Sequence, residues 1–398
     1  MTTTKTNKLT TAAALAAIAT ALPALAGPAA IVDTPAPPAS NGDWCNSLKT
    51  FGEFYSNSDA SFIQELKFFG RFQWQAGTVD GEDFAGMSAD DDFTEIRRFR
   101  IGTEVKFFDH FTLKVNANLE DGGPNDHSFG YESLDEAKLT YSAGDILGFN
   151  DVAFTYGRHK FTFSEEAHTS SKKIKTIERS NIANYFYASA RPTGLTVSGA
   201  KGGVNGTLGV FSTDVDNELA GWGEGLAYYA NLQFEAAGGN VNLDFLYNDI
   251  SMGDVDGFGF EWGTSAAYTT TVGDWEIMAN ILYGERHDGD AVYGLVIMPS
   301  TFLIEDRLEF VARYQYAASD DDHLKLSSRY ARRADDVGGK GSFGAKGSEN
   351  HTLYAGLNYY LCGHNSKFQV GLEYETLENE AGLDADALTA WLAYRMYF

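Results

Sequence analysis

Proline is scarce in this sequence after its first tenth. The chain of 398 residues contains eight prolines, five of them within the first 38 residues, and only Pro124, Pro192 and Pro299 follow. Proline cannot donate a backbone hydrogen bond, so paired strands exclude it. The scarcity is typical of a chain built almost wholly of paired strands. We expect the three late prolines to lie in connections.

Long hydrophobic runs are also missing beyond the first 26 residues. Residues 9–25 are mostly apolar, follow Lys5 and Lys8, and close with Ala24-Leu25-Ala26, which predicts a cleaved signal peptide over residues 1–26. No later segment has the ~20 continuous apolar residues that a membrane-spanning helix needs. Barrel strands escape this test, because their side chains alternate between lipid and lumen.

Basic residues are a minority. The chain has 30 Lys and Arg against 55 Asp and Glu, a formal charge of -25 that becomes -27 when Lys5 and Lys8 leave with the signal peptide. So acidic a chain is not expected to bind nucleic acid. Its eight histidines show no zinc-like spacing to a cysteine pair, and no nucleophile or phosphate-loop motif occurs. We predict no enzymatic activity, no catalytic residue, no metal and no cofactor.

Alternation with a period of two dominates the chain from Gln64 onward. In residues 367–375, the even-numbered positions are apolar or aromatic and the odd-numbered ones are polar or glycine. One face suits lipid and the other suits water. The pattern predicts an all-β transmembrane antiparallel barrel of about sixteen strands, with fourteen and eighteen left open: 64–75, 94–107, 111–120, 133–142, 150–161, 193–201, 203–212, 224–237, 239–250, 257–271, 274–285, 290–298, 307–317, 350–361, 366–377 and 387–398.

The connections alternate between long and short, as external loops and periplasmic turns do in bacterial barrels. The loop at 76–93, after the first strand, is the first of the long connections. The chain ends on an aromatic, Phe398, like the assembly signal of outer-membrane barrels. We therefore predict a bacterial outer-membrane protein. Its domains are the signal peptide, a loosely ordered periplasmic arm or linker over 27–61, and the barrel over 62–398.

Several segments resemble the phosphate-selective porin family, the porin O and P group. Residues 96–102 read IRRFRIG, like the family's Arg-Arg-x-Arg-x-Gly run, and residues 156–166 read YGRHKFTFSEE, like its Gly-Arg-x-Lys-x-x-Phe-x-x-Glu segment. The pairs Ser170-Ser171 and Glu178-Arg179 and the run Arg191-Pro192-Thr193-Gly194 follow at similar places. The resemblance implies a passive trimeric pore whose third external loop, 162–192, folds inward and whose basic residues guide anions.

Basic residues on three neighbouring strands are the candidate pore lining. Alternation places six of them on the lumen face: Lys67, Arg71, Arg98, Arg100, Lys106 and Lys114. The third loop adds Lys172, Lys173, Lys175 and Arg179, which would lie opposite this wall if the loop folds inward. Together they would raise the local concentration of anions. The alternative is a solvated loop whose lysines contact water or lipopolysaccharide phosphates.

Other charged residues leave two interpretations open. Parity points Arg97 to the lipid face, where it would reach the headgroups, unless a bulge turns it inward. The runs at 90–92 and 320–322 are either divalent-cation sites or solvated acidic loops. The basic run of the seventh external loop is equally undecided: Arg329, Arg332, Arg333, Lys340 and Lys346.

The two cysteines allow a single disulfide. Cys362 occupies a predicted periplasmic turn and Cys45 lies in the arm on the same side. A bond between them would pin the arm beneath the barrel, and two free thiols are the alternative.

The leading functional hypothesis is an anion-preferring, phosphate-type diffusion channel that contacts outer-membrane lipid, lipopolysaccharide and small anionic solutes, as a homotrimer. A general or cation-preferring porin is the alternative, and a barrel that only anchors or adheres is a third. In the cation-preferring version, the acids of the lumen dominate: Glu104, Glu235, Asp244, Glu276, Glu309, Glu373 and Glu375.

Overall fold

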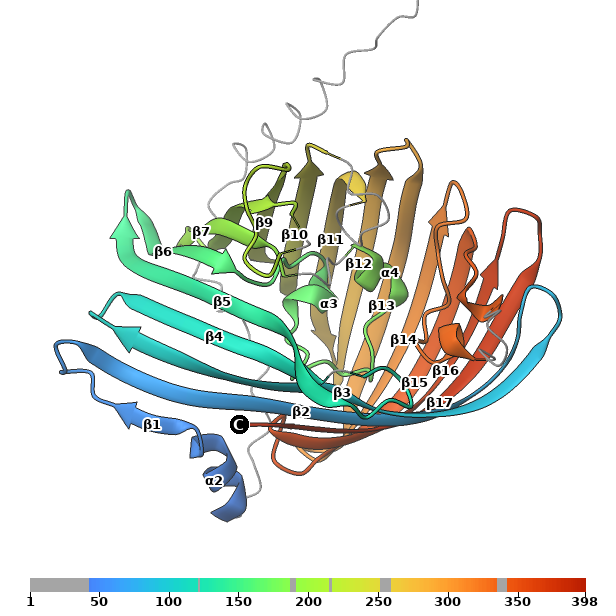
Figure 1. Ribbon diagram of the computed structural model, residues 1–398, viewed down its shortest axis with the longest axis horizontal. Coiled ribbons are helices and arrows are strands. Elements are labelled where there is room, and N and C mark those ends of the chain that lie inside the picture. The colour runs from blue at the N-terminus through green and yellow to red at the C-terminus, as the bar shows by residue number, and fades with distance from the viewer. Residues whose placement is uncertain (1–42, 121, 187–190, 215–216, 251–258, 335–341) are drawn as a thin grey trace, which may run out of the picture.

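The computed structural model describes residues 43–120, 122–186, 191–214, 217–250, 259–334 and 342–398. Sixteen antiparallel strands close into a barrel in which the last strand pairs with the first, which confirms the predicted number (Figure 1). No helix in these ranges is long and apolar enough to cross a membrane. The strands are β2 (Ile63–Glu82), β3 (Ser88–Phe107), β4 (Phe111–Glu120), β5 (Phe129–Ile146), β6 (Phe149–Arg158), β7 (Thr193–Lys201), β8 (Val204–Ser212), β9 (Leu226–Ala236), β10 (Gly239–Asn248), β11 (Phe260–Val272), β12 (Trp275–Arg286), β13 (Ala291–Ile304), β14 (Leu308–Ser319), β15 (Glu349–Tyr360), β16 (Ser366–Glu378) and β17 (Asp384–Tyr397).

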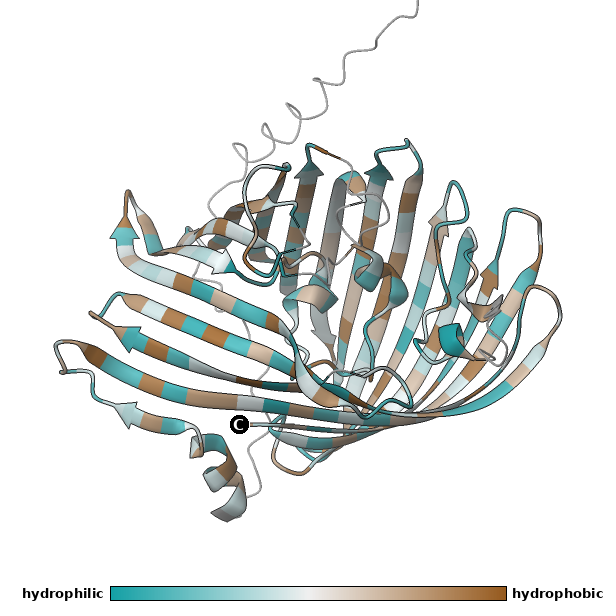
Figure 2. Cartoon of the chain, viewed as in Figure 1, coloured by the Kyte–Doolittle hydropathy of each residue, from teal (hydrophilic) through white to brown (hydrophobic). Residues whose placement is uncertain are grey.

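Alternating side chains give each strand a lipid face and a lumen face, visible as brown and teal bands along the strands (Figure 2). In β16, Phe368, Val370 and Leu372 are exposed on the outer face, whereas Gln369 and Glu373 between them are buried. Because the period of a strand is two, this single pattern sets which residues can reach the lumen.

Two predicted boundaries are wrong. β2 and β3 run on to a tight hairpin at 83–87, so most of the predicted loop 76–93 is paired strand, and Asp91 lies opposite Val79. Pairing with β2 outweighs the low strand propensity of the acids at 90–92. Pro299 lies inside β13, not in a connection. The ladder from β13 to β14 passes from Ile297 directly to Ser300, so the missing N–H falls where that ladder is interrupted.

The segment before the barrel is folded where the structure describes it. The predicted signal peptide and the first part of the arm lie outside the described residues. Residues 43–61, predicted to be loosely ordered, contain helix α2 (Asp43–Thr50) and strand β1 (Glu53–Ser56). β1 pairs with β2 at Glu65–Lys67, on the edge that β17 occupies from Arg71 onward. β1 therefore continues the edge of β2 beyond the end of the last strand.

The arm and the chain end meet at this seam. The rings of Phe51 and Phe398 lie edge to face, 5.1 Å apart. The structure joins Cys45 of α2 to Cys362 in the β15–β16 turn by a disulfide, with 5.6 Å between their Cα atoms. This arrangement agrees with the predicted pairing, which stays a prediction for the protein in solution.

Long connections gather at one end of the barrel and short turns at the other. Loop 3, between β6 and β7, carries helices α3 (Glu165–His168) and α4 (Asn181–Phe186), and its described residues 159–186 fold into the lumen, as predicted (Figure 1). Phe186 of this loop stacks on Phe163 of the same loop and on Phe260 of β11, so part of the hydrophobic core lies between loop 3 and the barrel wall.

The described parts of loop 7, between β14 and β15 (residues 320–334 and 342–348), also turn inward and carry the short helices η1 (Ala331–Arg333) and η2 (Ser342–Gly344). Tyr330 stacks on Phe93 and on Trp391, with centroid distances of 4.9 and 4.6 Å. Because this tyrosine is fully buried, it fixes the arginines that surround it in the sequence inside the barrel.

Candidate functional site

Loop 3 is bound to one side of the lumen by buried charges. Arg313 of β14 is only 1% exposed and lies 2.9 Å from the Glu373 carboxylate, and it donates a 2.8 Å hydrogen bond to the backbone oxygen of Glu178. Lys367 donates to the backbone oxygen of Ile174 at 2.6 Å. Arg395 donates to that of Ile177 at 2.9 Å. These cations of the β14–β17 wall hold the loop backbone and do not face open lumen.

The lumen acids of β10–β16 serve the same purpose. Lys175 of loop 3 lies 2.8 Å from Glu276 and 3.2 Å from Glu309. His168 of loop 3 bonds to Asp244 at 2.8 Å. Glu375 accepts hydrogen bonds from the backbone amides of Ser327 and Ser328 of loop 7. Most of the carboxylates that would make the pore cation-preferring are therefore neutralised or hydrogen-bonded.

Arg97 faces the lumen because of a bulge, which decides between the two interpretations left open by the sequence. In the β2–β3 ladder, Gln73 pairs with Arg98 and Trp74 with Ile96, so Arg97 is the extra residue. Its guanidinium Nε lies 2.6 Å from Glu178 of loop 3. A bulge of this kind turns a side chain that parity would place on the other face.

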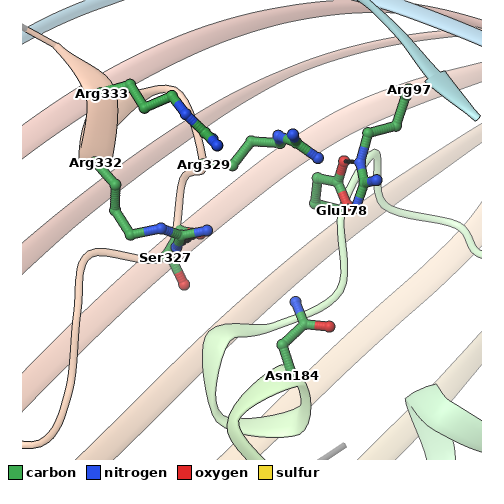
Figure 3. Close-up of a pocket in the computed structure, with 7 residues that line it drawn as sticks. All are labelled: Arg97, Glu178, Asn184, Ser327, Arg329, Arg332 and Arg333. Carbon is green, nitrogen blue, oxygen red and sulfur yellow. Dashed lines mark hydrogen bonds and ion pairs between the residues drawn. The ribbon is translucent and has the colours of Figure 1, made fainter. Parts of the chain in front are cut away.

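A cavity of about 250 Å³ lies between loop 3, loop 7 and the bulge (Figure 3). The arginines of loop 7 face Arg97 and Glu178 across it. Arg329 also pairs with Glu95 at 3.1 Å, and Arg332 donates to the backbone oxygen of Ser327 at 2.8 Å. Its lining consists of Arg97, Glu178, Asn184, Ser327, Arg329, Arg332 and Arg333.

Two buried donors of this lining have no hydrogen-bond partner among the described residues: Ser327 Oγ and Arg329 Nε. A buried donor left unpaired costs about 1–3 kcal/mol. Donors that a protein leaves unpaired in a basic cavity are suited to an acceptor that arrives from outside, such as an oxyanion.

The charges of the cavity persist at neutral pH. Burial alone would raise the pKa of Glu178, but Arg97, Arg98 and Arg329 hold it well below its usual range. Burial lowers the pKa of Arg329 to about 10, which leaves its guanidinium protonated. Four guanidinium groups therefore face one carboxylate in the lining.

The predicted strand cations form a basic wall that is partly neutralised. Arg98 donates to Gln73 at 2.8 Å, Arg100 lies 3.0 Å from Asp135, and Lys114 lies 2.9 Å from Glu136. Arg71 donates to the hydroxyl of Ser171 in loop 3. Nearer the short turns, Lys67 pairs with Glu65 and Lys106 is exposed.

The predicted cations of loop 3 have different roles. Arg179 donates to two backbone oxygens of its own loop, those of Glu166 and Thr169, so it holds the loop's shape. The Lys172 ammonium lies over the Tyr397 ring, 4.4 Å from its centroid. Lys173 is half-buried, and Lys175 is paired as described above. None of the ten predicted cations is among the residues that line the cavity.

The cavity arginines were missed as a set. The three arginines within residues 329–333 were noted in the sequence as part of a basic run of undecided role, and they were not among the predicted pore-lining residues. The decisive fact, that this loop folds inward, depends on Tyr330 and has no pattern in the sequence. Of the other members of that basic run, Lys340 lies outside the described residues and Lys346 does not line the cavity.

One group of described residues could hold a metal ion. Donor atoms of Asp288, Asp290 and His323 lie within 4.8 Å of one another at the outer end of the barrel. Arg286 already contacts Asp288, and His323 already bonds to Asp290 at 2.9 Å. The three side chains are therefore accounted for by their own ion pairs.

The closed sixteen-strand barrel with an inward third loop, together with a family match, identifies this chain as an outer-membrane porin, a non-enzymatic channel. Residues 66–251 match the family model Phosphate-selective porin O and P, which confirms the resemblance found in the sequence. None of the curated proteins matches the chain.

Solved porins share the fold at low identity. The outer membrane channel DcaP of Acinetobacter baumannii is 12% identical, with 87% of this chain and 100% of that one covered and a TM-score of 0.56. An anion-selective porin from Comamonas acidovorans is 11% identical, with 83% and 99% covered and a TM-score of 0.55. The trimer form of OmpT of Vibrio cholerae is 13% identical, with 84% and 99% covered and a TM-score of 0.50.

Proposed function

We propose that this porin is an anion-preferring diffusion channel that binds small oxyanions, of the phosphate type, in the cavity between loops 3 and 7. The observation that carries the proposal is the lining itself, with four guanidinium groups, one carboxylate and two unpaired donors. Guanidinium groups bind oxyanions through paired, charge-assisted hydrogen bonds. A structurally similar porin is anion-selective.

The use of the lumen acids argues against a cation-preferring pore. Asp244, Glu276 and Glu309 are paired with loop 3, and Glu373 is paired with Arg313. Glu235 is exposed near the short β9–β10 turn, away from the cavity. Selectivity follows the charges that remain open to solution at the constriction, and these are mainly arginines.

We propose that the channel works as a homotrimer in contact with outer-membrane lipid and lipopolysaccharide. A structurally similar protein has a trimer form. The outer face is apolar, with Leu353, Leu372 and Leu392 exposed on adjacent strands, as either lipid or a neighbouring barrel requires. Sedimentation of the refolded protein in mild detergent tests the assembly, and a monomer would contradict it.

The test of selectivity is the reversal potential of the refolded protein in a planar bilayer under a KCl gradient, followed by titration with phosphate. We expect an anion-selective potential and block by phosphate. The double variant Arg329→Gln/Arg333→Gln should raise the half-blocking concentration about tenfold or more, because each change removes a full charge next to the ligand.

A matched control removes two positive charges at the other end of the barrel. Lys201→Gln/Arg307→Gln changes the net charge equally at the ends of turns and should leave block unchanged. A cation-selective wild-type potential without phosphate block would overturn the proposed function.

A further inference from the structure

We propose that Glu178 is a built-in counter-ion of the arginine cavity, which competes with the bound anion and thereby sets the affinity of the site and its preference for divalent over monovalent anions. The inference rests on the proposed function and assigns a specificity-determining residue to it.

The geometry places the Glu178 carboxylate where a ligand would bind Arg97. Its Oε1 accepts from Arg97 Nε at 2.6 Å, and its Oε2 accepts from Arg97 Nη2 at 3.4 Å. Gln75 donates to Oε1 at 3.0 Å. A carboxylate and a phosphate use the same guanidinium fork, so an incoming oxyanion must share Arg97 with Glu178.

Arginines are the main charged neighbours of Glu178, and one further carboxylate, that of Glu95, accepts from the same Gln75 amide at 2.7 Å. Arg329 approaches it from across the cavity (Figure 3), and Arg98 and Arg329 both favour its charged form. The Glu178 side chain is 12% exposed, so water screens it only weakly. Its negative charge therefore lowers the positive potential that every anion in the cavity experiences.

A weaker site is an advantage for a channel. Conduction requires an anion to leave as well as to enter, and binding that is too tight slows its exit. Without the Glu178 charge, four arginines would face the ligand with no carboxylate in the lining. We expect such a site to retain divalent anions and to pass less current at saturation.

Glu178 also belongs to the fold of loop 3, but through its backbone. Its carbonyl oxygen accepts from Arg313 Nη1 at 2.8 Å and from Thr176 Oγ1 at 2.7 Å. Glu178→Gln keeps both of these bonds, the size of the side chain and an oxygen for Gln75. The substitution therefore removes the charge and little else.

The experiment compares chloride and sulfate binding, from the concentration dependence of single-channel conductance, in wild-type and Glu178→Gln channels. The change in potential acts in proportion to the charge of the anion, so we expect sulfate to bind about tenfold more tightly and chloride about threefold, with lower saturating conductance. A loosened loop 3 would not produce a gain that grows with anion charge.

Two control variants isolate the charge at this position. Glu276→Gln makes the same chemical change beside Lys175, outside the lining, and should alter neither affinity by more than about twofold. Glu178→Asp keeps the charge and should behave like wild type. If Glu178→Gln fails to fold, Glu178→Ala removes the same charge and should give the same unequal gains.

The outcomes separate this inference from the proposed function. An anion-selective wild-type channel whose sulfate affinity is unchanged, or gains no more than chloride affinity, in Glu178→Gln would overturn the role of Glu178 alone. A cation-selective wild-type channel would overturn the proposed function and this inference with it.

Discussion

The two sides of the lumen carry the same kinds of basic side chain, but these side chains have different roles. On the β10–β17 side, Arg313 and Lys367 are fully buried and are bonded to loop 3 or its acidic partners. On the β2–β3 side and in loop 7, arginines converge on a cavity, and two buried donors of its lining have no partner among the residues that the structure describes. The partners of a lumen arginine therefore decide its role. The arginines of the β10–β17 side hold loop 3 and so form the constriction. The arginines of the cavity are available to solutes.

We expect the largest effect on conduction and stability from a change on the β10–β17 side, where buried charges hold loop 3. In Arg313→Met, Glu373 and Glu166 lose the cation that they share. Leaving such acids buried without it costs about 3–5 kcal/mol. We expect loop 3 to leave the lumen, with larger single-channel conductance and loss of phosphate block, measured in the planar bilayer alongside heat stability.

The control for this variant is Arg313→Met/Glu373→Gln, which removes both partners and should recover part of the lost stability. Unchanged conductance and heat stability in Arg313→Met would show that the buried charges do not hold the loop.

On the β2–β3 side of the lumen, we expect Lys172 to make the anion selectivity of the channel depend on pH. Its ammonium has no ion-pair partner among the described residues and lies over the Tyr397 and Phe69 rings. Burial, aided by repulsion from Arg71 and Lys114 and opposed by Glu104 and Glu136, lowers its pKa to about 8. The lysine is charged below this value, so we expect anion selectivity to decline as the pH rises through about 8.

Reversal potentials in KCl across this range measure the effect without phosphate, which itself titrates nearby. Lys172→Met should show the reduced selectivity at every pH. A wild-type titration that persists in Lys172→Met would assign the pH dependence to another group.

We expect the smallest effect on conduction from a change that lies on neither side of the lumen. Cys45→Ser/Cys362→Ser removes the disulfide that links α2 to the β15–β16 turn. We expect unchanged selectivity and a loss of about 2–4 kcal/mol in stability against denaturant. Mass spectrometry of non-reduced wild-type peptides checks the pairing, and two free thiols would contradict it.

Much of the barrel could be predicted because alternation is a local signal. It gave the number of strands, the lumen face of β16 and the inward direction of Arg98 and Arg100. It failed where pairing between strands overrode local composition, at Asp91 in β3 and at Pro299 in β13. Neither residue favours a strand by itself.

The candidate site was harder to predict, because its parts meet only in the folded chain. Arg97 depends on a bulge, and Arg329 depends on the stacking of Tyr330 between two distant strands. The ring contacts of Tyr330 join residues more than 60 positions apart, and no spacing in the sequence encodes them or the bulge. The resemblance to a family could indicate an inward third loop, but it gave no indication of loop 7.

The place of β1 has a consequence for the order of assembly. This strand and α2 are among the first parts of the barrel region to be synthesised, yet Phe51 contacts the final residue and Cys45 bonds to the β15–β16 turn. Both contacts require a nearly complete barrel. We therefore expect α2 and β1 to reach their positions only after β15–β17 have joined the barrel.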